Sequence, residues 1–222
     1  MKYSLWHKKT VQALGPVSDL ALYLRTLVFS LVIFGLTYGY TAWMKLPNVL
    51  NKSVADTSII LIGLSMLLSG VCYFWNLFDT KIVYRKHLGL VGFAYGVIHM
   101  VLSYQAFLAF FSSATWIKGV PWAALTGLIA AVIFLIMTIS SNQYSAIHLG
   151  GKVWRMVLRT GYIAVLLVMA HVIILKLSRW LTWYDNGMAT PPSLSLIVTV
   201  FMAIVILLRL ALWRSLKTKQ SK

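Results

Sequence analysis

The sequence predicts an all-α fold: a polytopic integral membrane protein built as a six-transmembrane-helix bundle with both termini in the cytoplasm. Hydrophobic residues make up 60% of the chain and charged residues only 11%, whereas a soluble domain has roughly 25% charged residues. Several apolar stretches also reach the length of about 20 residues that a helix needs to cross a bilayer. Lipid is therefore the expected solvent for most of the surface.

Six stretches qualify as transmembrane helices. The first is broken only by Arg25, the third starts after the basic pair at 85–86, and the fifth is the shortest but can extend back to Val153. The second and fourth contain no charged residue, and the sixth follows a Pro-Pro pair. The expected spans are 20–43, 57–76, 88–111, 121–140, 159–176 and 193–213. Because the connections are short, we expect one transmembrane domain over residues 1–222, without a flavin- or nucleotide-binding module.

Lysine and arginine are distributed unequally between the two ends of these helices. Fifteen lie on one side and five on the other. Cytoplasmic segments of membrane proteins are enriched in basic residues, so the fifteen predict a cytoplasmic side that includes both termini. An even number of spans agrees with this orientation. The five residues expected on the outer side are Lys45, Lys52, Lys118, Lys176 and Arg179.

Composition also excludes several classes of function. Glutamate is absent and only four aspartates occur, so hydrolysis by paired carboxylates and carboxylate metal cages lack their ligands. The single Cys72 excludes an intramolecular disulfide and a CxxC redox pair. The net charge of +16 is compatible with nucleic-acid binding, but the basic residues lie in short runs between apolar stretches, where they contact lipid headgroups. We expect the lipid bilayer as a partner, and no nucleic acid.

Two of the five histidines, His99 and His171, lie deep in apolar sequence. Ionisable side chains inside a membrane are costly, so these two are functional candidates. At 1.5 Å per residue they lie about 16 and about 20 Å from the cytoplasmic helix ends. Both helices run in the same direction, and two imidazoles at similar height can bind haem iron axially. The alternative is that each merely hydrogen-bonds across a helix interface. Zinc and copper are disfavoured, because no Cys, Asp or Glu is nearby.

The stripe of Gly89, Gly92 and Gly96 on the third span is open to two interpretations. Small side chains there would let either a flat porphyrin or a neighbouring helix approach closely.

Polar side chains near the expected cytoplasmic surface form a second group of candidates. His87 and His148 could serve as ligands of a second metal group near this surface, but His87 lies about 120° around the helix from His99 and so on another face. We therefore expect the two to be an exposed, solvated pair. The cations of this surface could contact haem propionates, a flavin phosphate such as that of FMN, or an electron donor. The positive-inside rule explains them without any ligand. The candidates are Arg85, His87, His148, Arg155 and Arg159.

The motifs around the two deep histidines form an ordered pattern, at positions 85–90, 93–95, 99, 103–104, 140–141, 149–150, 154, 162 and 171. Over roughly residues 60–180 this pattern resembles the ferric-reductase-like transmembrane domain family. Within it, the chain is most similar to the haem-binding membrane subunit of the bacterial periplasmic methionine sulfoxide reductase system. The resemblance implies a multi-pass protein of the bacterial inner membrane, with His99 and His171 at the positions of the bis-His pair for haem b.

The chain departs from the family pattern at two places. Many members carry a further histidine thirteen or fourteen residues before each of the pair. Those positions hold Arg85 and Lys86 on the third span and Val157 and Leu158 on the fifth. We therefore expect one haem per chain rather than two.

Three classes of function follow from these observations. The first is a membrane cytochrome b that carries electrons from a quinol or a separate flavin reductase to a periplasmic reductase subunit or to ferric chelates. It would be the electron-transfer subunit of an oxidoreductase system rather than a self-contained enzyme. The second is a scaffold or assembly protein without redox activity, which the leucine at 158 favours. The third, a small transporter or channel, is disfavoured because the spans lack intramembrane carboxylates and broken paired helices.

Overall fold

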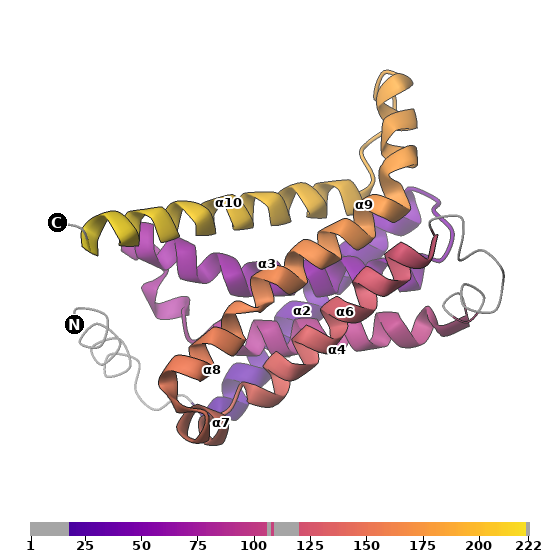
Figure 1. Ribbon diagram of the computed structural model, residues 1–222. Coiled ribbons are helices and arrows are strands. Elements are labelled where there is room, and N and C mark those ends of the chain that lie inside the picture. Colours follow the sequence, from indigo (N-terminus) through magenta and orange to yellow (C-terminus); the bar gives the residue numbers. More distant parts are fainter. Residues whose placement is uncertain (1–17, 106–107, 109–119, 221–222) are drawn as a thin grey trace.

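The computed structural model describes residues 18–105, 108 and 120–220, and this part of the chain folds into helices joined by short connections (Figure 1). No β-strand occurs in these ranges, so the all-α prediction is confirmed for them. The elements are α2 (Asp19–Trp43), α3 (Val49–Phe74), the 3₁₀ helix η1 (Asn76–Lys81), α4 (Tyr84–Leu102), α6 (Val120–Ser140), α7 (Gln143–His148), α8 (Gly150–Arg159), α9 (Gly161–Asp185) and α10 (Leu194–Gln220).

Local sequence explains where several helices begin and end. The Ser18 hydroxyl accepts a hydrogen bond from the backbone of the first turn of α2 at 3.2 Å, and Asp19 in that turn interacts favourably with the helix dipole. Between α2 and α3 the chain reverses through Lys45 and Asn48, whose φ angles are 49° and 55°. Gly150 separates α7 from α8 at φ 71°, a conformation that glycine adopts without strain.

The central helix is α3. In its most apolar stretch 50% of the residues are buried, compared with 17% in each of the other candidate spans. It packs against α2, α4 and α10. Hydroxyl groups lie at these contacts: Thr57 meets Thr37 of α2 at 2.9 Å, and Ser58 donates to the Gly92 carbonyl of α4 at 2.7 Å. Polar groups at depth in a bilayer require such partners, because no water is available there.

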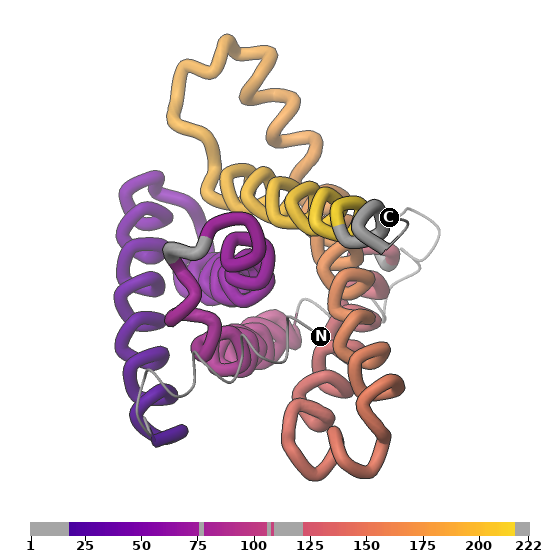
Figure 2. The backbone as a smooth tube through the Cα atoms, turned by 90° about the vertical axis from the view of Figure 1, so that its left-hand side faces the viewer, coloured from indigo at the N-terminus to yellow at the C-terminus, as the bar shows by residue number. Residues whose placement is uncertain are grey.

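The helices form two groups, which Figure 2 shows on opposite sides of the view with α10 lying across both. The first group is α2, α3 and α4, and the second is α6, α8 and α9, in which α6 packs along α9. Contact between the groups includes Phe93 of α4 and Phe134 of α6, whose ring centroids are 6.5 Å apart. The last turns of α9 project beyond the rest of the bundle (Figure 1).

Five helical segments in the described ranges are long and apolar enough to cross a membrane: α2, α3, α6, α8 together with α9, and α10. The multi-pass character is thereby confirmed. The remaining helix, α4, corresponds to the expected span 88–111, of which residues 106–107 and 109–111 lie outside the described residues.

Two expected boundaries are wrong. The second span starts at Val49 rather than at 57, and the fifth continues to Asp185 rather than ending at 176. Hydropathy ends a span at the first charged residue, but Lys52 and Lys176 lie inside α3 and α9 and are half-buried. They are part of the bundle rather than of its flanking loops.

The helix ends collect in two sets (Figure 1). One end, which we call the basic end, is where α4 and α8 begin, with Arg85, Arg155 and Arg159 nearby. At the opposite end α3 and α6 begin and α9 ends. Of the lysines used to predict orientation, Lys2, Lys8, Lys9, Lys118 and Lys222 lie outside the described residues.

Candidate functional site

The imidazole of His171 is held between α9 and α6. Its Nδ1 lies 2.7 Å from the carbonyl oxygen of Ala123. A carbonyl can only accept, so Nδ1 carries the proton and donates it. The lone pair of this neutral ring is then on Nε2, and no hydrogen bond to that atom comes from a described residue. Gly127 provides the space, because a Cβ at this position would lie 2.9 Å from His171 Nδ1.

The imidazole of His99 has a similar arrangement on α4. Its Nδ1 lies 2.6 Å from the side-chain oxygen of Asn51 on α3. The amide nitrogen of Asn51 donates to the Ser103 hydroxyl at 2.9 Å, which leaves the amide oxygen to face the imidazole. Nδ1 of His99 is therefore the donor, and its Nε2 is also the atom with the free lone pair.

The two imidazoles lie near the same end of the bundle. Asn51 is two residues into α3 and Ala123 is three residues into α6, which corresponds to about 3 and about 5 Å from the helix starts. The two rings are also close enough to interact electrostatically. A pair of neutral imidazoles from different helix groups thus faces the interior at the end opposite to the basic one.

The glycine stripe of α4 serves helix packing. Cβ atoms at Gly92 and Gly96 would meet Ile62 at 2.9 Å and Ser58 at 3.1 Å, both on α3. Of the two interpretations of this stripe, the close approach of a neighbouring helix is the one that the structure bears out. The glycine that lies beside an imidazole is Gly127, which the sequence pattern did not single out.

Charged residues near the imidazoles were also missed. Asp56 of α3 is only 7% exposed and interacts electrostatically with Lys52 and Lys176. Lys176 in turn interacts with both His99 and His171. The signal in the sequence was the presence of ionisable residues next to or inside apolar runs, the same criterion that selected the histidines.

The prediction that His87 is exposed and solvated is wrong. It is 2% exposed, with Nδ1 3.2 Å from the Val83 carbonyl and Nε2 3.2 Å from the Asp19 carboxylate. The Tyr23 ring meets it edge-on, with centroids 4.4 Å apart. Nε2 of His87 therefore serves the contact between α2 and α4, Nδ1 bonds to the start of its own helix, and neither nitrogen is free to hold a ligand.

The other candidates at the basic end are exposed, as expected for His148. His148 stacks on Tyr144, with ring centroids 3.8 Å apart, and its Nδ1 bonds to the Tyr144 carbonyl. Arg85, Arg155 and Arg159 are also exposed. The structure brings none of them to the two imidazoles, which lie toward the opposite end.

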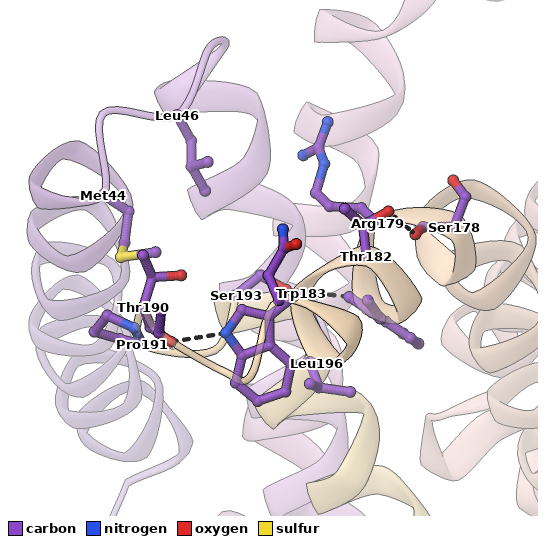
Figure 3. A pocket seen from close by; sticks show the side chains of 13 residues that line it. Met44, Leu46, Ser178, Arg179, Thr182, Trp183, Thr190, Pro191, Ser193 and Leu196 are labelled. Atoms are coloured by element: carbon purple, nitrogen blue, oxygen red, sulfur yellow. Dashed lines mark hydrogen bonds between the residues drawn. The ribbon is translucent and has the colours of Figure 1, made fainter.

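A separate pocket of about 580 Å³ lies beyond the imidazoles, where α9 ends and the 186–193 connection leads to α10 (Figure 3). The indole nitrogen of Trp183 donates to the Thr190 carbonyl at 2.7 Å, and that of Trp180 donates to the Ser193 hydroxyl at 3.1 Å. Trp183 is twelve residues beyond His171, which is about 18 Å along the helix. The pocket is therefore distinct from the imidazole site.

The metal-ligating side chains at the imidazole site suit one kind of metal-containing cofactor. No cluster of three or more His, Cys, Asp or Glu residues occurs in the described ranges, so a zinc site with three or four protein ligands is disfavoured there. Two neutral imidazoles, each fixed by a bond from Nδ1 to an oxygen acceptor, match the axial ligation of a six-coordinate haem iron. The residues present fit a haem.

Comparison with known proteins gives a family for the chain. The family model described as "Ferric reductase like transmembrane component" matches residues 54–168, which is 115 of 222 residues. His99 lies inside the matched segment and His171 lies three residues after its end. A search of curated proteins found no match. Because the match covers more than half of the sequence, the chain belongs to the family of ferric reductase-like transmembrane components.

Proposed function

We propose that this protein is a b-type cytochrome that relays electrons across a membrane, with one haem held by His99 and His171. The family supports a membrane electron-transfer role. The observation that carries the haem proposal is the matched pair of imidazoles. Each comes from a different helix group and donates Nδ1–H to an oxygen, which leaves its Nε2 free.

The haem would supply reversible one-electron chemistry between the ferric and ferrous states. The chain's own residues would hold and tune it. The acceptors on Asn51 and Ala123 fix the orientation of each ring and increase the basicity of its Nε2. The helices around the pair partly bury both rings, which strengthens the local electrostatics. Both rings remain unprotonated in this arrangement, as iron ligands must be.

The proposed donor is a quinol or a separate flavin reductase, with FMN or a quinone as an additional cofactor. The proposed acceptor is a periplasmic reductase subunit or a ferric chelate. The imidazoles lie near the end opposite to the basic one, which suits delivery of electrons to the outside. The proposed location is the bacterial inner membrane, with six spans and both termini cytoplasmic. Reporter fusions after Lys222 and within the 186–191 connection should report opposite compartments, and the topology is wrong if they report the same one.

The visible spectrum of the purified, detergent-solubilised protein tests the function. We expect a reducible b-type Soret band with an α-band, and a pyridine haemochrome value near one haem per chain. A value near two would show that ligands exist at the basic end as well. A colourless protein would instead favour the scaffold alternative, for which Leu158 at a family histidine position is the specific observation.

A further inference from the structure

A cluster of four charged residues lies beside the two imidazoles. Lys52 and Asp56 are one turn apart on α3, and Lys176 and Arg179 are three residues apart on α9. Asp56 interacts electrostatically with both lysines, and Lys176 interacts with Arg179. The cluster therefore joins the two helix groups at the same end as the imidazoles.

The cluster carries an excess of positive charge. Counted by residue type, three basic side chains and one carboxyl group give a formal charge of +2. The two ion pairs formed within the described residues both involve Asp19 at the basic end, so they do not neutralise this cluster. Asp185, which ends α9, is exposed. Unbalanced cations that are half-buried in a helix bundle, as Lys52 and Lys176 are, are costly and mark functional sites. Two further negative charges would complete the balance.

The position of Lys176 indicates where those charges should lie. It is five residues after His171, about 7.5 Å further along α9, and it is within electrostatic range of both imidazoles. Lys52 directly follows Asn51, the residue that binds His99. Both lysines are half-buried, whereas Arg179 is exposed and also lines the pocket at the end of α9. An anion that they hold would lie next to the imidazole pair, displaced toward the end where α9 terminates.

We propose that Lys52, Lys176 and Arg179, oriented by Asp56, form the site for the two propionate carboxylates of the haem and set its reduction potential. This inference rests on the proposed function. The propionate edge of the ring then faces the end where α3 begins. The exposed arginines at the basic end, Arg85, Arg155 and Arg159, do not contact it. The two propionates match the net charge of +2, and the ammonium groups act as positioning residues for the porphyrin.

The simpler alternative is that charge interactions within this cluster only stabilise the arrangement of α3 and α9. That role predicts a loss of stability in any variant, without an effect on the haem. The proposal predicts effects of opposite sign. Loss of a positive charge favours ferric iron and lowers the midpoint potential, whereas loss of the negative charge of Asp56 raises it.

The experiment uses three test variants, Lys176→Gln, Lys52→Gln and Asp56→Asn. Two variants are controls: Lys176→Arg keeps the charge, and Lys45→Gln changes an exposed lysine at the same end. Redox titration and resonance Raman spectra of the propionate bending bands are recorded on each purified holoprotein. We expect lower potentials and shifted propionate bands for both Gln variants, a higher potential for Asp56→Asn, and values near wild type for Lys176→Arg and Lys45→Gln.

Two outcomes overturn the proposal. One is an unchanged propionate band in both Gln variants at full haem occupancy. The other is a shift of the same sign in Lys176→Gln and Asp56→Asn. Wild-type protein without haem would instead contradict the proposed function, so the two failures are distinguishable. If Lys176→Gln fails to fold, Lys52→Gln and Asp56→Asn still give the comparison of opposite signs.

Discussion

The two helix groups are held together in different ways. In the first group α3 and α4 approach closely at the glycines of α4, and side-chain hydroxyls also connect α3 to its neighbours: Thr57 to Thr37, Ser58 to the Gly92 carbonyl, and Ser65 to the Arg85 carbonyl at 2.6 Å. The second group relies on close approach of small residues. Three alanines of α6 and α9 are at most 1% exposed: Ala123, Ala130 and Ala164. Within the described residues, the bond from His171 to Ala123 is the one hydrogen bond between α6 and α9.

Both solutions suit a bilayer, where helices gain little from hydrophobic burial against each other and associate through hydrogen bonds and tight packing. The difference extends to the imidazoles. His99, in the hydroxyl-rich group, is oriented by a side chain, that of Asn51. His171, in the small-residue group, is oriented by a backbone carbonyl, and the missing side chain of Gly127 makes room for its ring. The same imidazole geometry thus depends on different kinds of residue in the two groups.

The largest expected effect comes from removing an imidazole from either group. His99→Ala or His171→Ala deletes one of the two proposed iron ligands, so we expect loss of most of the haem, or a five-coordinate iron with a shifted Soret band. The pyridine haemochrome assay and the reduced spectrum measure this. His148→Ala, at an exposed position, is the matched control and should keep the wild-type spectrum. Wild-type spectra at full occupancy in both variants would end the bis-His proposal.

The second prediction addresses the small-residue group alone. Gly127→Ala places a Cβ 2.9 Å from His171 Nδ1 and 3.3 Å from Cε1, so the ring must move and its bond to Ala123 must lengthen. We expect reduced haem content and altered low-spin EPR signals. The control is Gly35→Ala on α2, where a Cβ meets nothing within 4 Å and the helix should gain about 0.5–1 kcal/mol. Normal haem content and EPR signals in Gly127→Ala would show that the ring does not need this space.

The third prediction addresses the support of His99. Asn51→Ala removes the acceptor at 2.6 Å, and loss of such a partner typically costs about 10–100-fold in affinity. Haem transfer to an apo-haem acceptor, followed by absorbance, measures the change. Thr57→Val, on the same helix but without contact to an imidazole, should release haem at the wild-type rate. Equal release from both variants would mean that Asn51 does not orient the ligand.

The sequence predicts the presence of the helices better than the residues at which they begin and end. Long apolar runs identify the five helical segments that are long and apolar enough to cross a membrane, and also the helix α4, because their composition alone requires burial in lipid or protein. The limits at 57 and 176 are wrong because a hydropathy window treats Lys52 and Lys176 as flanking residues. Lys176 interacts with Asp56 across two helices and 120 positions of sequence, which a local window cannot detect.

The histidines are predictable for a similar reason, and their surroundings are not. An ionisable residue inside an apolar helix stands out from sequence alone. A backbone carbonyl such as that of Ala123 has no signature in the sequence, and Gly127 looks like any other small helix residue. The burial of His87 was missed because its partners, Asp19 and Tyr23, lie on α2, more than 60 positions away.

The smallest expected effect concerns the hydroxyl contacts that define the first group. Thr37 and Thr57 are 4% and 0% exposed, and their hydroxyl oxygens are 2.9 Å apart. Valine has nearly the same shape and no hydroxyl, so Thr37→Val, Thr57→Val and the double variant form a thermodynamic cycle. Hydrogen bonds between membrane helices contribute about 0.6 kcal/mol on average and at most about 1.7 kcal/mol. We expect a coupling energy in that range from unfolding in detergent monitored by circular dichroism.

Thr199→Val is the control, because the Thr199 hydroxyl donates to the Ser195 carbonyl of its own helix. The haem spectrum should stay unchanged throughout, since neither threonine contacts an imidazole. A coupling near zero would mean that the hydroxyl contacts do not hold this group together, and that both groups depend on close packing alone.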